Sequence, residues 1–212
     1  MSDGQEPLPP EEFRKLLELE LPRWNLTARE PSVAALARFL AELDRWRRRV
    51  NLTGRLSSTE LVSHSLESVL GARFLPEGAR VVDIGTGGGF PGVPLALWRP
   101  DLEVTWLEPR GKRAAFLRHV ARTIPAENAR ILVARQEDLP REGFGYATSR
   151  ALTSKPDVWA DAPFLQAGGA LLLWTTGPEK RAADLAAHGL RFEGALPVPG
   201  SRGRAIGLFR KA

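Results

Sequence analysis

A glycine-rich turn follows a short apolar run near the middle of the chain. Residues 81–92 read VVDIGTGGGFPG, which predicts a strand over residues 80–84 and a helix over residues 91–98. The glycines between them allow a sharp turn and let a ligand lie against bare main chain. The first amides of the following helix then face that ligand. The turn therefore predicts a site for a nucleotide-like cofactor.

The glycine spacing and the acid before it indicate which cofactor. A dinucleotide fingerprint reads G-x-G-x-x-G, whereas this turn reads G-x-G-x-G-x-x-G and is preceded by Asp83. A carboxylate there would repel a phosphate but attract the sulfonium and ammonium groups of S-adenosylmethionine (SAM). Class I SAM-dependent methyltransferases carry a motif resembling E/D-x-G-x-G-x-G. We therefore favour SAM, with a pyridine nucleotide or a turn without a ligand as alternatives.

The pattern of apolar residues in the sequence changes near residues 75–78. Before this point, apolar residues recur at spacings of three and four, which predicts helices over residues 11–21, 32–50 and 57–74. Ser32 is expected to cap the second helix, and Ser57 with Glu60 resembles a capping box for the third. We predict an N-terminal helical cap over residues 1–76 and a SAM-binding methyltransferase domain over residues 77–212.

After this point, expected strands and helices alternate. Such alternation implies a mostly parallel sheet with helices on both faces. The prediction is an α/β, Rossmann-like class I SAM-dependent methyltransferase fold with a seven-stranded sheet and an N-terminal helical cap. The expected strands cover residues 80–84, 103–107, 130–133, 146–149, 170–174, 190–196 and 205–209, and the expected helices cover residues 91–98, 112–124 and 179–188.

Polar residues at the ends of the expected strands are candidate ligands, because open α/β sheets bind outside the carboxyl ends of their strands. Glu108 follows the second strand, about 20 residues beyond the glycines, where an acid can bind ribose hydroxyls. Gln136 and Glu137 follow the third strand and could flank an adenine, or form only a polar turn. The cofactor-binding candidates are Asp83, Gly85, Thr86, Gly87, Gly89, Phe90, Glu108, Gln136, Glu137 and Arg150.

Arg150 is the candidate for the substrate side of the site. It follows the fourth expected strand, where the transferred methyl group should emerge. An arginine there can hold a phosphate or hydrogen-bond the Hoogsteen edge of guanine. A plain surface arginine is the alternative reading.

The composition excludes several classes of site. The chain has no cysteine, which excludes disulfides and thiolate metal sites, and its three histidines are far apart, so no metal site is expected. No apolar run approaches the ~20 residues that span a bilayer, and no signal-peptide pattern opens the chain. We expect a cytoplasmic monomer. The formal charge of +5 permits a polyanionic partner without requiring one.

Several motifs occur together in a recognisable order. They are Asn51-Leu52-Thr53, His64 with Ser68, the glycine turn ending in Phe90-Pro91-Gly92, Leu107-Glu108 with Lys112-Arg113, and Thr148-Ser149-Arg150-Ala151. In this order they resemble the bacterial 16S ribosomal RNA guanine-N7 methyltransferases, also called glucose-inhibited division protein B. The resemblance covers roughly residues 35–175. It implies SAM as cofactor, a helical cap, and methylation of one guanine in the 16S rRNA of the 30S subunit.

The chain departs from the pattern of that family in three places. Glu67 stands where the family usually has Asp, and Gln136 stands where it usually has Ala. After the fifth strand the family usually carries Lys-Gly, whereas here the run Trp174-Thr175-Thr176-Gly177 lacks the lysine. If that lysine holds RNA, substrate choice or activity is in doubt.

The residues present also bear on the reaction. Methylation of a pyrimidine C5 commonly needs a cysteine, and methylation of an exocyclic amine usually goes with an Asn/Asp-Pro-Pro-aromatic motif where this chain has Ser149-Arg150-Ala151-Leu152. Guanine N7 has a free lone pair, so its methylation needs only positioning of two reactants. The alternatives are a SAM-dependent enzyme acting on a small molecule and a non-catalytic SAM-binding protein.

Basic residues gather in three places that could bind RNA. The first lies at the end of the second helix, the second begins the helix after Glu108, and the third lies at the C-terminus. They contain Arg45, Arg47, Arg48 and Arg49; Arg110, Lys112 and Arg113; and Arg202, Arg204, Arg210 and Lys211.

Overall fold

The computed structural model describes residues 6–27, 29–150, 159 and 162–212. Its centre is a seven-stranded sheet in the order β3-β2-β1-β4-β5-β7-β6. β1 to β5 run parallel to one another, and β7 runs antiparallel to both β5 and β6. The predicted mostly parallel, seven-stranded sheet is therefore confirmed, and β6 and β7 form an antiparallel pair at its edge. The strands are β1 (Arg80–Ile84), β2 (Glu103–Leu107), β3 (Ala129–Leu132), β4 (Phe144–Ser149), β5 (Leu165–Thr176), β6 (Leu190–Pro197) and β7 (Arg204–Lys211).

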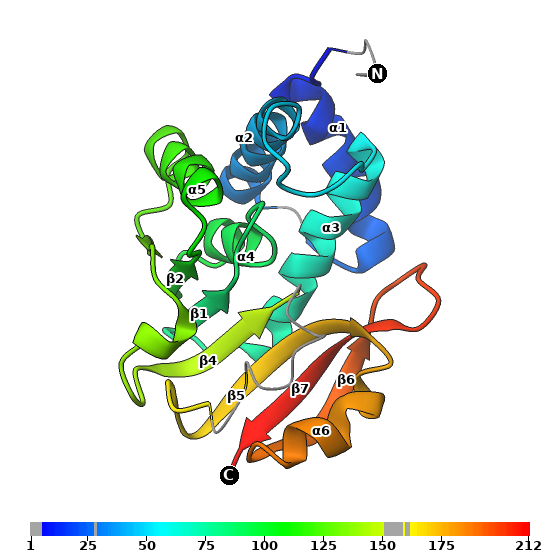
Figure 1. Ribbon diagram of the computed structural model, residues 1–212. Helices are drawn as coiled ribbons and strands as arrows, with labels where there is room; N and C mark the ends of the chain where they lie inside the picture. The colour runs from blue at the N-terminus through cyan, green and yellow to red at the C-terminus, as the bar shows by residue number, and fades with distance from the viewer. Residues whose placement is uncertain (1–5, 28, 151–158, 160–161) are drawn as a thin grey trace.

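Three helices precede the sheet and lie together on one side of it (Figure 1). They are α1 (Pro10–Glu20), α2 (Glu30–Arg47) and α3 (Ser58–Leu70), with 3-10 turns at Leu21–Trp24 and Gly71–Phe74. The capping box of α3 is confirmed, because the Ser57 hydroxyl accepts from the Glu60 N–H and the Glu60 carboxylate accepts from the Ser57 N–H. The predicted cap of α2 is wrong. The helix begins at Glu30 with a proline in its first turn, where a missing N–H costs nothing, and Ser32 is buried inside it.

The remaining helices follow the strands. They are α4 (Gly92–Trp98), α5 (Gly111–Thr123) and α6 (Ala182–Ala186), with 3-10 turns at Gln136–Asp138 and Pro178–Arg181. The continuous helix predicted over residues 179–188 is instead a 3-10 turn followed by a short α-helix. Figure 1 shows α6 beside β6, on the opposite side from the N-terminal helices.

Neighbouring residues of each strand face opposite sides of the sheet, so each face has its own core. The first core contains Val81 and Leu172, and it is continuous with Phe39 of α2 and Leu66 of α3. The second core contains Val82 and packs against α6. The N-terminal helices therefore have no separate core but complete the core above the sheet.

The strand order creates a topological switch point between β1 and β4. The chain proceeds from β1 through β2 to β3 in one direction and then returns to place β4 on the other side of β1. In open α/β sheets the ligand crevice lies at this point, outside the carboxyl ends of the strands. Asp83 is the penultimate residue of β1 and Arg150 directly follows β4, which places both beside the crevice.

Within the described residues, no helix combines the length and the apolar character needed to cross a bilayer. In the same part of the chain, no three His, Asp or Glu side chains come together as possible metal ligands.

Candidate active site

Asp83 lies near the carboxyl end of β1 with none of its surface exposed. One carboxylate oxygen accepts from the Thr148 hydroxyl at 2.9 Å, and the other accepts from the Gly92 N–H at 3.0 Å. Burial raises the pKa of Asp83 to about 7, against the opposing effect of its hydrogen bonds from Thr148 and Gly92. The carboxylate therefore ties β1 to β4 and to the start of α4.

The glycine turn folds back onto the end of β2. Gly85, Gly87 and Gly89 have positive φ values of 72°, 57° and 103°, a region that side chains disfavour. The N–H groups of Gly85 and Thr86 both donate to the Leu107 carbonyl. A Cβ on Gly87 would meet no atom closer than 3.4 Å, so the main chain at Gly87 is open on that side.

Glu108 follows β2 and is 2% exposed. Its Oε2 accepts from the Gly87 N–H at 2.9 Å, and its Oε1 accepts from the Arg110 N–H at 2.9 Å. Each carboxylate oxygen can accept a further hydrogen bond. The Arg113 Nη1 and the Glu108 Oε2 lie 3.4 Å and 3.9 Å from the point where a Gly87 Cβ would stand. The predicted ribose acid is thus brought directly to the glycine turn, with a cation beside both.

The N-terminal helical region packs closely against the same turn, through α2 and the loop that follows it. A Cβ on Gly88 would lie 2.7 Å from Thr53 Cγ2 and 3.0 Å from the Leu52 carbonyl oxygen. A Cβ on Gly89 would lie 2.7 Å from Phe39 Cζ in α2. The glycines therefore serve the approach of the cap as well as the turn itself. The motif Asn51-Leu52-Thr53 suggests from sequence that Asn51 and Thr53 brace the junction between cap and domain, and the contact of Thr53 with the turn agrees with this interpretation.

Arg150 comes directly after β4, and its guanidinium is held by α3. Its Nη2 donates to Glu67 Oε2 at 2.8 Å, and Arg204 Nη1 of β7 lies 3.5 Å from the same oxygen. Burial lowers the pKa of Arg150, and Glu67 works against that shift. The Nη1 group is buried and donates to no atom of the described chain. Arg150 is thus an oriented arginine, held in place by a carboxylate that sequence reasoning did not assign to the site.

Phe90 links Arg150 to the glycine turn. The Arg150 guanidinium carbon lies 5.9 Å from the centre of the Phe90 ring, within the range of a cation–π contact. The His64 ring packs in a T-shaped arrangement with the same ring, and the two ring centres are 5.8 Å apart. Burial, and next the charges of Arg150 and Arg204, lower the pKa of His64 to about 3. The imidazole is therefore neutral at physiological pH.

Gln136 and Glu137 lie on the 3-10 turn that follows β3. β3 pairs with β2, and the Glu108 N–H donates to the Leu132 carbonyl at the end of β3. The two residues are thus on the same edge of the sheet as Glu108. Their contact with the adenine of a cofactor stays a prediction.

A family model described as rRNA small subunit methyltransferase G matches residues 32–186. Curated relatives bear the name ribosomal RNA small subunit methyltransferase G. The protein from Desulfotalea psychrophila is 41% identical over 129 residues, which cover 58% of this chain and 59% of the relative. The protein from Xanthomonas axonopodis is 39% identical over 142 residues, which cover 66% of each. The chain thus spans less than two thirds of the length of these relatives.

Solved structures share the fold at low sequence identity. A SAM-dependent methyltransferase from Aquifex aeolicus is 16% identical, with a TM-score of 0.56 over 68% of this chain and 87% of its own. The mitomycin 7-O-methyltransferase MmcR is 20% identical, with a TM-score of 0.58 over 95% of this chain and 84% of its own. These likenesses establish the class I methyltransferase fold that the sequence predicted.

Proposed function

This chain belongs to the rRNA small subunit methyltransferase G family, and from that premise we propose that it transfers a methyl group from SAM to N7 of a guanine in 16S rRNA. The observation that carries the proposal is the placement of two groups at the switch point. A glycine turn braced by Glu108 lies beside β1, and the oriented Arg150 lies beside β4. The proposed substrate is the rRNA within the cytoplasmic 30S subunit, and the protein acts as a monomer.

The residues at the turn fit SAM. The bare main chain at Gly87 offers room, and Glu108 keeps acceptor capacity for two ribose hydroxyls. Arg113 Nη1 lies 3.4 Å from the Gly87 Cβ position, so this flexible side chain would move aside for the ribose. SAM, when bound, supplies an electrophilic methyl group on a sulfonium. The proposed cofactor-binding residues are Gly85, Thr86, Gly87, Gly89, Phe90, Glu108, Gln136 and Glu137, with Arg150 at the methyl side and Asp83 acting through the turn.

The reaction needs no general base. The N7 lone pair forms the new N–C bond, the S–C bond breaks with its electron pair going to sulfur, and no proton leaves the guanine. Arg150 would donate to the guanine O6 or to a neighbouring phosphate, which orients the base and leaves the N7 lone pair free. The neutral His64 and the absence of cysteine agree with a site that works by positioning.

The missing family lysine has a local substitute in this proposal. Thr176 stands at that position, and its partner across the β5–β7 ladder is Arg204. Side chains directly opposite on an antiparallel pair are neighbours. A cation is thus retained close to the lysine position, but it comes from β7 and lies 3.5 Å from Glu67.

The test is transfer of radiolabelled methyl from SAM to 30S subunits that lack the modification, followed by nucleoside analysis. The expected product is 7-methylguanosine, with no label entering 30S subunits that already carry the modification. Label in another nucleoside would contradict the N7 assignment. Tight SAM binding without transfer to rRNA would instead favour a small-molecule substrate or a non-catalytic protein.

A further inference from the structure

A hollow of about 460 Å³ opens between the end of α2 and the start of α5. It is lined by Arg49, Val50, Asn51, Arg110, Gly111, Lys112 and Arg113, and we call it the basic hollow. Four of these seven residues are cationic and none is acidic. The lining comes from two segments more than 50 residues apart in sequence, so only the folded chain brings the charges together.

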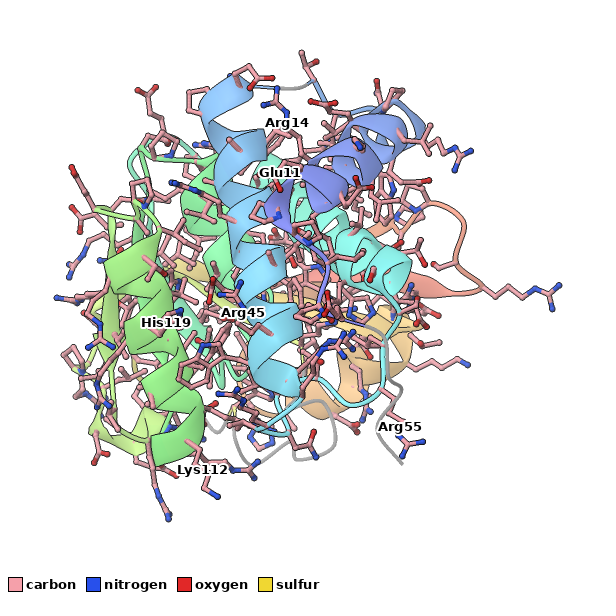
Figure 2. All side chains as sticks on the ribbon, turned by 90° about the horizontal axis from the view of Figure 1, so that it is seen from above. Glu11, Arg14, Arg45, Arg55, Lys112 and His119 are labelled. Carbon is pink, nitrogen blue, oxygen red and sulfur yellow. The ribbon has the colours of Figure 1, made fainter. Side chains whose placement is uncertain are left out.

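The cations of the basic hollow are not neutralised by acids in the part of the chain that the structure describes. Within the described residues, Arg49, Arg110, Lys112 and Arg113 take part in no ion pair. Glu108 precedes the second segment of the lining, and its two oxygens accept main-chain N–H groups of Gly87 and Arg110. Arg49, Arg110 and Lys112 are exposed. Figure 2 shows Lys112 extending from the N-terminal start of α5.

The rest of the basic cluster at the end of α2 differs from the hollow, because nearby acids balance it. Arg45 pairs with Glu42 at 2.9 Å. Arg47 pairs with the buried Asp44 at 2.5 Å, and Arg48 lies 3.4 Å from the same carboxylate. These charges stabilise the helix end, and of the predicted cluster Arg49 is the member that lines the hollow.

Most cations of the C-terminal basic cluster also form ion pairs or hydrogen bonds within the protein. Arg204 shares Glu67 with Arg150, and Arg210 pairs with Glu193. The Lys211 ammonium donates to the Ala162 and Leu165 carbonyls. Among the residues that the structure describes, the cluster at the start of α5 is thus the one of the three predicted clusters in which several cations form no ion pair.

The start of α5 strengthens the case for an anionic ligand. The helix has no side-chain cap and no acid in its first turn, and it carries Lys112 and Arg113 there instead. Cations at a helix N-terminus oppose the helix dipole, so this arrangement favours a further anion beside the Glu108 carboxylate, which already accepts from the Arg110 N–H. An anion in the basic hollow would interact favourably with both the side chains and the helix.

The hollow adjoins the glycine turn. The Arg113 guanidinium reaches from its lining to within 3.4 Å of the Gly87 Cβ position. On the other side, Asn51 is followed by Leu52 and Thr53, which pack on Gly88. We infer that the basic hollow binds backbone phosphates of the rRNA strand that carries the target guanine and so holds that strand beside the methyl donor. This inference rests on the proposed function for the identity of the polyanion.

The test compares two double variants of α5 that remove equal charge. R110Q/K112Q removes two of the cations that line the hollow and keeps Arg113 at the glycine turn. R118Q/R122Q removes two exposed arginines farther along the same helix, outside the hollow. Three quantities are measured for each: the KM for unmodified 30S subunits, the affinity for SAM by calorimetry, and the binding of a 16S rRNA transcript across a salt series.

For R110Q/K112Q, we expect the KM for 30S subunits to rise at least tenfold with kcat and SAM affinity unchanged. The plot of the logarithm of the RNA-binding constant against the logarithm of the salt concentration should become less steep by about 1.4, or 0.7 for each lost single-strand phosphate contact. R118Q/R122Q should change the KM less than twofold.

Equal effects of the two variants would overturn the inference, because only total charge would matter. A loss of SAM affinity in R110Q/K112Q would show that the hollow serves the cofactor instead. The transcript assay separates this inference from the proposed function. If the wild type binds the transcript with the expected slope but methylates no rRNA, the proposed reaction fails and the phosphate site stands. If the wild type does not bind the transcript, the phosphate site fails.

Discussion

Glu67 of α3 accepts a hydrogen bond of 2.8 Å from Arg150 at the end of β4, although 83 positions separate the two residues. The main-chain carbonyl of Glu67 also accepts from the Trp174 indole N–H of β5 at 3.0 Å. One residue of the cap thus fastens it to two central strands. The N-terminal helices therefore build part of the substrate side of the site.

Glu67→Gln should destabilise the protein strongly. It leaves Arg150, which is 19% exposed, facing Arg204 without a carboxylate between them. Removing one partner of a buried pair typically costs about 3–5 kcal/mol. Urea unfolding should show this loss, whereas Glu67→Asp, which keeps the charge, should lose much less. A Glu67→Gln/Arg150→Met double variant should recover part of the stability, and full additivity of the two single changes would contradict the pairing.

Arg150→Ala should abolish most methyl transfer while leaving SAM affinity unchanged. Glu67 keeps Arg204 as a partner in this variant, so the fold should survive. Because the proposed role is positioning, kcat should fall by roughly 100-fold or more. Single-turnover kinetics with 30S subunits and calorimetry with SAM separate the two quantities. Parallel loss of SAM binding would contradict the assignment to the substrate.

Sequence periodicity predicted the central strands because they are short, apolar and bounded by turn residues. β1 and β2 match their predicted ranges, residues 80–84 and 103–107, at both ends. The prediction for β5 covered only residues 170–174, because Gly168 and Gly169 read as a break, yet the observed strand continues through them from Leu165 to Thr176. A register shift in its pairing with β4 accommodates the irregular part.

The parts of the candidate site that come from neighbouring segments of the sequence were predicted. The glycine turn and Glu108 are separated by one strand and one helix, and their contact follows from the βαβ geometry. The Glu67–Arg150 pair could not be found this way, since it depends on how α3 crosses the sheet. The partners of Asp83 could not be found this way either, because it accepts hydrogen bonds from Thr148 on β4 and from Gly92 at the start of α4. Its contact with a cofactor stays a prediction.

Alanine substitutions in the turn should separate cofactor binding from folding. Gly87→Ala should cost about 1–2 kcal/mol of stability, the usual penalty of the left-handed region, because its Cβ meets nothing closer than 3.4 Å. That Cβ would occupy the space proposed for the cofactor, so SAM affinity should fall at least tenfold. Gly89→Ala should cost more, about 2–4 kcal/mol, because its Cβ would lie 2.7 Å from Phe39. Thermal unfolding with and without SAM measures both effects, and equal destabilisation by the two changes would contradict this division.

His64 should make stability depend on pH in the acidic range. Its pKa is about 3 in the folded protein, against 6.5 for a histidine side chain in water, so between these values the unfolded chain binds a proton that the folded chain does not. Stability therefore rises with pH over this window and is lost as pH falls. At pH 5 the loss should be about 1–2 kcal/mol relative to pH 7. Urea unfolding of His64→Gln should lack this component. A His64 resonance that titrates near pH 6.5 would contradict the burial.

Asp83 should produce the opposite dependence. Burial raises its pKa to about 7 in the folded protein from the ordinary value of 3.8, so between these values the folded chain holds a proton that the unfolded chain has lost. This contribution is full below about pH 4 and is lost as pH rises through about 7. Asp83→Asn removes the titration but also puts an amide where the carboxylate accepts from both Thr148 and Gly92, which costs about 1–3 kcal/mol.

The measurable quantity is the difference in unfolding free energy between wild type and Asp83→Asn, followed from about pH 4 to pH 8 by urea unfolding. This difference should shrink steadily as pH rises, because only the wild type loses a stabilising proton. Thr148→Val offers a matched control, since it removes a hydrogen bond to Asp83 without removing the titrating group. The difference in unfolding free energy between Thr148→Val and wild type should still depend on pH. The Asp83 carboxyl titrates in both proteins, but its charged form is less stabilised in the variant. A pH-independent difference for Asp83→Asn would mean that the carboxylate stays ionised, and that hydrogen bonds outweigh its burial at the end of β1.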